Sequence, residues 1–158
     1  MPHRMRHARR QGSNTRALRW ASLGLAVIGL LDSVYLLVYK LSGNNRMCLG
    51  NGGCHDVNFS SYSEFHGIPV SILGILAYLM ILAVLFLELR WKTARAQGPL
   101  VVFGLSLVGV LYSTYLTYLE LEVIHAVCPF CVTSAVVISL IFILAIIRLI
   151  QTTLSQST

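Results

Sequence analysis

The sequence predicts an all-α membrane protein, built as a bundle of four transmembrane helices. The 158-residue chain is 56% hydrophobic and only 11% charged, a balance unlike that of a water-soluble domain. Its apolar residues gather in four nearly charge-free stretches: 18–39, 69–89, 99–119 and about 129–150. Each stretch is close to the ~20 residues that a helix needs to cross ~30 Å of hydrocarbon. Four spans leave too little polar sequence for a separate soluble domain.

The first stretch follows a basic head, which is also the general form of a secretory signal peptide. Its apolar part is longer than the roughly 7–15 residues of a signal h-region, and no convincing small-x-small cleavage site follows it. We therefore interpret 18–39 as a retained span. This interpretation divides the chain into a basic N-terminal segment (1–17), a four-helix membrane domain (18–150) and a short tail (151–158).

The net charge of +6 is unevenly distributed, and its placement indicates membrane topology rather than nucleic-acid binding. Basic residues mark the cytoplasmic side of membrane spans. They are Arg4, Arg6, Arg9, Arg10, Arg16 and Arg19 before span one, Arg90, Lys92 and Arg95 between spans two and three, and Arg148 at the end of span four. We therefore expect both termini to be cytoplasmic, with residues 40–68 and 120–127 forming two outer loops.

Under this topology all four cysteines lie on the outer side, where disulfides persist. Cys48 and Cys54 fall in the first outer loop, and Cys128 and Cys131 fall at the start of span four. Four cysteines permit three pairings, and the sequence leaves the resting pairing open. Two inert structural disulfides are one alternative to redox exchange. A four-thiolate zinc site is another, but C-x5-C fits the C-x2-4-C spacing of zinc ribbons poorly, so we expect no metal.

The segment Cys128-Pro129-Phe130-Cys131 is a C-x-x-C motif that opens span four. Pro129 suits the first helical position, and the partial charge at a helix N-terminus stabilises the thiolate that attacks disulfides. Cys131 lies about one turn, ~4–5 Å, deeper in the membrane than Cys128. We therefore expect Cys128 to exchange with the loop cysteines, and Cys131 to face a lipid-soluble two-electron acceptor, for which a quinone is the natural candidate.

The loop that carries Cys48 and Cys54 has two parts. Residues 50–53 are turn formers that keep the first part flexible, as a shuttle pair requires. Residues 55–66 mix apolar and polar side chains and predict a short amphipathic helix that lies in the membrane interface and caps the site. Tyr62 and Phe65 are expected to cover the ring of a bound quinone.

Three polar residues lie at the outer end of span three: Glu120, Glu122 and His125. A histidine at this place is able to aid proton transfer to a reduced quinone. We nevertheless interpret His125 as an interfacial, solvated residue.

Two segments carry a family resemblance: CLGNGGCHDVNFSSYSEFHGIPVSILGILAY (48–78) and YLELEVIHAVCPFC (118–131). In order, spacing and topology they resemble the two conserved blocks of the vitamin K epoxide reductase family, and match its bacterial and archaeal members best. The likeness covers about residues 20–150. It implies a quinone-dependent thiol–disulfide oxidoreductase of a bacterial or archaeal plasma membrane, with its active site on the outer face.

The resemblance also implies a role for each cysteine. Cys131 would be the active-site residue that reduces the quinone through a charge-transfer or covalent adduct, with Cys128 as its resolving partner. Cys54 would form the relay disulfide with Cys128. Cys48 would be the shuttle cysteine closest to the external partner.

For the quinone itself, Ser60 matches the family serine that contacts a quinone oxygen, and Ser61 is the neighbouring alternative. Ubiquinone, menaquinone and a vitamin K-type quinone all remain open as the acceptor. Ala135 stands where the mammalian enzyme has a tyrosine that lines its anticoagulant site. Epoxide reduction and the anticoagulant response are therefore not implied for this chain.

Many bacterial relatives carry a fused thioredoxin-like domain after the bundle, whereas this chain ends eight residues past Ile150. We therefore expect the electron donor to be a separate thioredoxin-fold oxidoreductase of the DsbA kind, and the output to be disulfide formation in exported proteins. Alternatives are a vitamin K quinone or epoxide reductase, a non-enzymatic scaffold with structural disulfides, and a transporter. The lack of charge along the spans, with Asp32 alone well inside, disfavours the transporter.

Overall fold

The computed structural model describes residues 2–43, 53–60, 63–65 and 67–156. It is a four-helix bundle, as predicted. Its long helices are α1 (Pro2–Ser42), α3 (Val70–Arg90), α4 (Lys92–Leu119) and α5 (Pro129–Gln156). Four segments are long and apolar enough to cross a membrane: Asn14–Ser42, Val70–Arg90, Arg95–Ile124 and Pro129–Leu154.

The apolar sequence covers the outside of the bundle as well as its core. In hydrocarbon a helix satisfies its own backbone hydrogen bonds, so apolar side chains can face lipid on one side and protein on the other. Leu31, Val108 and Leu111 are each roughly two-thirds exposed. The core is built from a smaller set contributed by all four helices, whose fully buried members include Ala26, Ile81, Leu85, Val102, Ile141 and Ala145.

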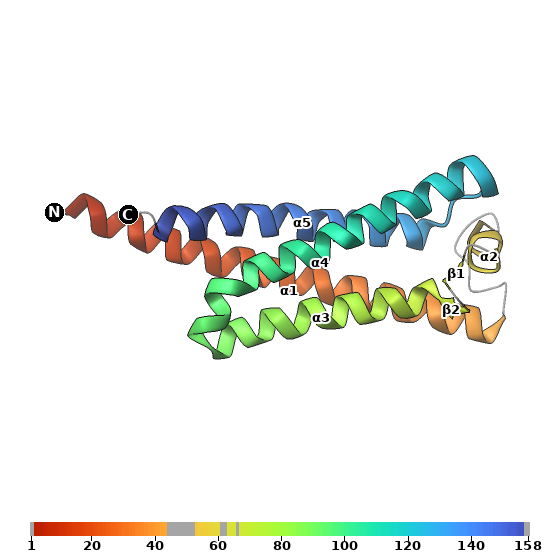
Figure 1. The fold of residues 1–158 in the computed structure, drawn as a ribbon, viewed down its shortest axis with the longest axis horizontal. Coiled ribbons are helices and arrows are strands. Elements are labelled where there is room, and N and C mark those ends of the chain that lie inside the picture. The colour runs from red at the N-terminus through yellow and green to blue at the C-terminus, as the bar shows by residue number, and fades with distance from the viewer. Residues whose placement is uncertain (1, 44–52, 61–62, 66, 157–158) are drawn as a thin grey trace.

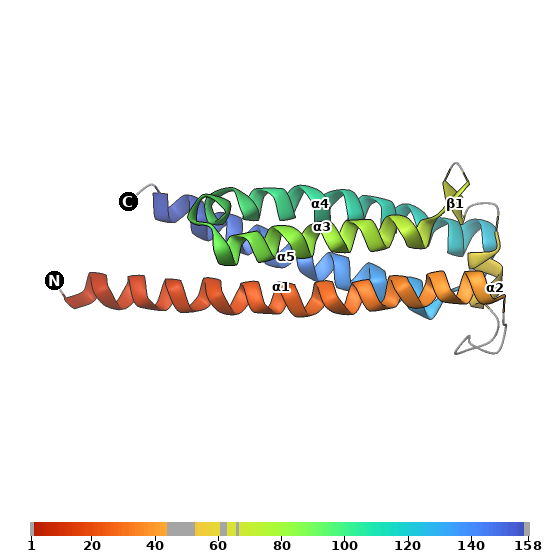
Figure 2. The same cartoon turned by 90° about the horizontal axis from the view of Figure 1, so that it is seen from below.

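Both chain ends lie at one end of the bundle, which we call the terminal end, next to the α3–α4 connection at Trp91 (Figure 1). The opposite end, the loop end, holds α2 (Gly53–Asn58), β1 (Glu64–Phe65), β2 (Ile68–Pro69) and the α4–α5 junction (Figures 1 and 2). Helix α1 packs on α3 and α5, and α4 packs on the same two helices. The two predicted outer loops therefore meet at one end of the bundle.

The cap at the loop end differs from the predicted helix over 55–66. Helix α2 ends at Asn58, and β1 and β2 pair antiparallel with Glu64 opposite Pro69. The hydroxyl of Ser60 donates to the Val57 carbonyl at 2.8 Å, which offers the backbone an alternative to further helix. Gly67, at φ +80°, makes the tight turn that only glycine adopts without strain.

A buried charge cluster connects the helices at the terminal end. Glu88 of α3 is 1% exposed and forms an ion pair with Arg148 of α5, itself 5% exposed. The Nε of Arg19 on α1 lies 3.9 Å from Glu88 Oε2. Arg95 Nε on α4 donates to the Glu88 carbonyl oxygen at 2.8 Å. These three arginines, predicted to mark the cytoplasmic side, therefore also hold the four helices together.

Candidate active site

The α4–α5 junction positions the C-x-x-C motif at the loop end. Helix α4 continues into a π-helical turn, Glu120–Ile124, and His125 then adopts the left-handed conformation with φ 53°. The amide of Ala126 donates to the Glu120 carbonyl at 3.1 Å, which closes the turn. Helix α5 begins at Pro129, and the Cys128 carbonyl accepts the Val132 amide at 3.1 Å. Cys128 is thus the residue that caps α5.

Cys128 and Cys131 carry free thiols, and their side chains hydrogen-bond to each other. Cys128 is fully buried and packs with Leu36 and Tyr39 of α1 and with Val57 of α2. The hydrogen bond from the Cys131 thiol lowers the pKa of Cys128, and the amides at the start of α5 act in the same direction, although burial opposes them. Cys128 is therefore the thiol that the start of α5 prepares to ionise.

A carboxylate lies against both cysteines. Glu120 is 4% exposed, and its Oε2 accepts the backbone N–H of Cys128 at 3.3 Å. The same side chain lies close to the Cys131 thiol. The π-helical turn thus brings an acidic group to the C-x-x-C motif.

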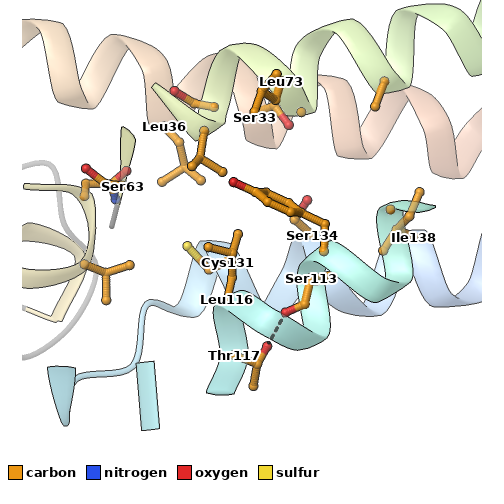
Figure 3. Close-up of a pocket in the computed structure, with 18 of the residues that line it drawn as sticks. Ser33, Leu36, Ser63, Leu73, Ser113, Leu116, Thr117, Cys131, Ser134 and Ile138 are labelled. Atoms are coloured by element: carbon orange, nitrogen blue, oxygen red, sulfur yellow. Dashed lines mark hydrogen bonds between the residues drawn. The ribbon is translucent and has the colours of Figure 1, made fainter. Parts of the chain in front are cut away.

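A cavity of about 480 Å³ opens beside the motif, with walls from all four long helices and the cap. Cys131 and Glu120 line it, whereas Cys128 lies behind its wall. Figure 3 shows the Cys131 side chain pointing into the cavity, with Ser33 and Leu36 on the opposite wall and Leu116 on its own side. Most lining side chains are apolar, which is typical of a site for a small hydrophobic ligand.

Some polar side chains of the cavity wall belong to the cap or lie next to it. Ser60 lines the cavity, with its hydroxyl hydrogen donated to Val57 as described above. Lys40 Nζ donates to Ser63 Oγ at 3.0 Å and pairs with Glu64 Oε1 at 3.0 Å. This chain of contacts connects the end of α1 to the β1–β2 hairpin that covers the site.

The predicted site residues are described to different extents. Cys131 and Ser60 line the cavity, and Cys128 contacts Cys131. Cys54 belongs to α2, and Phe65 belongs to β1, but their side chains lie outside the described part of the structure. Three further predicted residues, Cys48, Ser61 and Tyr62, lie outside the described residues altogether.

The described part of the chain contains no group of three or more His, Cys, Asp or Glu side chains placed to hold a metal ion. The side chains at the motif are a dithiol and a carboxylate, beside a largely apolar cavity. This combination suits two-electron exchange with a hydrophobic acceptor.

Comparison with known proteins agrees with this geometry. The sequence model of the vitamin K epoxide reductase family matches residues 20–146, which include all four cysteines and the cavity. The chain belongs to this family. Together with the four apolar helices, family membership makes it a membrane protein.

The chain is also similar to a curated protein, the thiol-disulfide oxidoreductase LTO1 of Arabidopsis thaliana. The two sequences are 28% identical over 124 residues, which is 74% of this chain and 33% of that protein. The chain thus spans about a third of the length of the relative that it matches.

Three residues of the cavity wall were not predicted as site residues from the sequence. Glu120 accepts the Cys128 amide, and Tyr78 lines the cavity with its hydroxyl 3.1 Å from Ser134 Oγ. Ser71, also on the cavity wall, has a buried hydroxyl with no hydrogen-bond partner in the described part of the chain. The sequence did contain a signal for Glu120, because a carboxylate at membrane depth carries a large free-energy cost and often marks a functional site.

Proposed function

We propose that this protein is a membrane thiol–disulfide oxidoreductase that passes electrons from a reduced thioredoxin-fold partner to a membrane quinone. The observation that carries the proposal is the position of Cys131, which belongs to a free dithiol and faces a largely apolar cavity of about 480 Å³. That volume falls within the ~300–1,000 Å³ of typical small-molecule sites. The name of the Arabidopsis relative supports the thiol–disulfide part of the proposal.

The residues of the cavity fit a quinone head group. Ser71 has a buried hydroxyl without a partner among the described residues, and it is free to donate to a quinone oxygen. Ser60 is the second candidate for such a contact, once its hydroxyl turns away from the Val57 carbonyl. The apolar walls suit a ring and an isoprenoid tail, whether of ubiquinone, menaquinone or a vitamin K-type quinone. A bound quinone accepts an electron pair and two protons and leaves as the hydroquinone.

The proposed cycle begins at the outer loop. A thiolate of the partner opens a Cys48–Cys54 disulfide, which oxidises the partner and leaves both loop cysteines reduced. The Cys54 thiolate attacks Cys128 of the Cys128–Cys131 disulfide, which forms Cys54–Cys128 and releases Cys131. Cys48 then attacks Cys54, which restores the loop disulfide and releases Cys128. The Cys128–Cys131 dithiol closes to a disulfide as its two electrons and two protons pass to the acceptor.

In this proposal the loop end faces the outer side of a bacterial or archaeal plasma membrane, and both termini are cytoplasmic. The basic residues near the terminal end support this orientation through the positive-inside rule. The biological output is disulfide formation in exported proteins, because the partner leaves each cycle oxidised.

The test uses purified protein in detergent, mixed with a reduced thioredoxin-fold oxidoreductase and a soluble quinone. Quinone absorbance should fall with the wild type and stay constant with Cys131→Ala. Val132→Ala, at an exposed neighbouring position of α5, is the matched control and should retain activity. If the wild type consumes none of several quinones, the proposal is wrong.

A further inference from the structure

One acidic residue of the cavity wall has no role in the cycle above. Glu120 is 4% exposed and lines the cavity beside the C-x-x-C motif. Its Oε2 accepts the Cys128 amide at 3.3 Å, and its carboxylate lies close to the Cys131 thiol. The residue therefore lies close to the sulfur that faces the proposed quinone site, on the wall of the same cavity.

The charge of Glu120 has no cationic partner within the described part of the chain. Lys40, which lines the same cavity, is paired with Glu64 at 3.0 Å. A buried carboxylate held only by hydrogen-bond donors is costly in its charged form. Uptake of a proton from a neighbouring group is therefore favourable at this position.

We propose that Glu120 is the proton acceptor for Cys131 during quinone reduction, a role that rests on the function proposed above. As Cys131 delivers its electrons, its S–H bond breaks and the proton forms an O–H bond on the Glu120 carboxylate. That proton then passes to a quinone oxygen, which restores the carboxylate. Cys128 supplies the second proton, so the two-electron reduction balances with no further reactant.

Two other titratable residues of the junction are poorly placed for this role. Glu122 and His125 are exposed, and neither lines the cavity. The interpretation of His125 as a solvated residue agrees with this position. Glu122 lies two residues from Glu120 on the same π-helical turn, which makes it the matched control.

The first test needs no quinone. In reduced protein with the other three cysteines replaced by serine, the infrared S–H stretching band reports on Cys131 alone. A thiol that donates to a charged acceptor forms a stronger hydrogen bond than one that donates to a neutral acceptor. Glu120→Gln should therefore move the band to higher frequency, and Glu122→Gln should leave it in place. A band that does not move in Glu120→Gln overturns the proposal.

The second test measures turnover with the reduced partner and quinone. General-base catalysis contributes about 10²–10⁴-fold to rate, so Glu120→Gln should lower kcat at least about 100-fold with little change in the KM for quinone. Glu120→Asp keeps a carboxylate and should recover a measurable part of the loss. Glu122→Gln should match the wild type.

The outcomes separate the two proposals. A wild type that reduces no quinone overturns the proposed function itself. A wild type that turns over, with Glu120→Gln equally fast, overturns the role of Glu120 alone. Equal losses in Glu120→Gln and Glu120→Asp, with lowered thermal midpoints, indicate a purely structural role and also overturn it.

Discussion

Glu88→Leu is predicted to destabilise the bundle by about 3–5 kcal/mol, because it leaves a buried guanidinium without its opposite charge. The side chains of Glu88 and Arg148 are 1% and 6% exposed, so solvent does little to replace the lost partner. Arg19, 3.9 Å from the same carboxylate, loses its neighbour as well. The loss corresponds to a roughly 150- to 5,000-fold change in the unfolding equilibrium, a large share of the ~5–15 kcal/mol that stabilises a typical domain.

Equilibrium unfolding in mixed detergent micelles, followed by circular dichroism, measures this loss. Glu64→Gln is the control, because the Glu64 side chain is 49% exposed and its pair with Lys40 should contribute at most about 1 kcal/mol. The double variant Glu88→Leu, Arg148→Met removes both charges and should be more stable than Glu88→Leu alone. A Glu88→Leu variant within about 1 kcal/mol of the wild type would refute the reasoning.

Two further predictions concern α1 and the thiol pair. Gly29→Ala should destabilise by about 1–3 kcal/mol in thermal unfolding, because its Cβ would overlap the Tyr78 ring. Gly24→Ala is the control, because nothing lies within 4 Å of the added Cβ, and it should be neutral or stabilising by up to ~1 kcal/mol. Equal effects at the two positions would contradict this view of the packing. The third prediction compares the Cys128 pKa in two variants, both with the loop cysteines replaced by serine. The pKa should be higher in Cys131→Ala than in Cys131→Ser, so the Cys128 thiolate of the alanine variant is protonated at a higher pH. The reason is that the alanine removes the hydrogen bond that lowers the Cys128 pKa. Titration of thiolate absorbance measures both midpoints, and identical values would show that the bond has no such effect.

The four spans were predictable because the length of an apolar stretch is a direct physical requirement for crossing hydrocarbon. The predicted stretches at 69–89 and 129–150 begin within one residue of α3 and α5. Helix α1 instead begins at Pro2, well before the predicted position 18. Arg and Ala are good helix formers, so the helix continues through a basic head that is too polar to insert in a membrane.

The cap was predicted less well because its structure depends on local hydrogen bonds. Amphipathic composition over 55–66 is compatible with a helix, but it contains no information about where Ser60 and Ser63 donate. Both hydroxyls bond to carbonyls three residues earlier, and the chain then turns at Gly67. Glycine at this position was a sequence signal for the turn, whereas the hairpin pairing was not visible in the sequence.

The C-x-x-C motif at the start of α5 was predictable from Pro129, but the position of Glu120 was not. It requires a π-helical turn and a left-handed His125, which together bring the carboxylate to the Cys128 amide. A regular α-helix through residues 120–124 would present Glu120 in a different direction, because each π turn contains an extra residue. Such turns arise from tertiary packing and are frequent at functional sites, which is the pattern observed here.

On three helices, a residue of the charge cluster at the terminal end is the same number of positions away from a residue of the cavity wall. The separation is 17 positions on each helix, between one residue of the charge cluster and one of the cavity wall. The pairs are Arg19 and Leu36 on α1, Glu88 and Ser71 on α3, and Arg148 and Cys131 on α5. At 1.5 Å per residue, the spacing is about 25 Å on every helix. A slip of one helix by a turn, ~5.4 Å, would break the ion pairs and displace the cavity wall together. The charge cluster at the terminal end therefore opposes a slip that would move Cys131 away from the cavity.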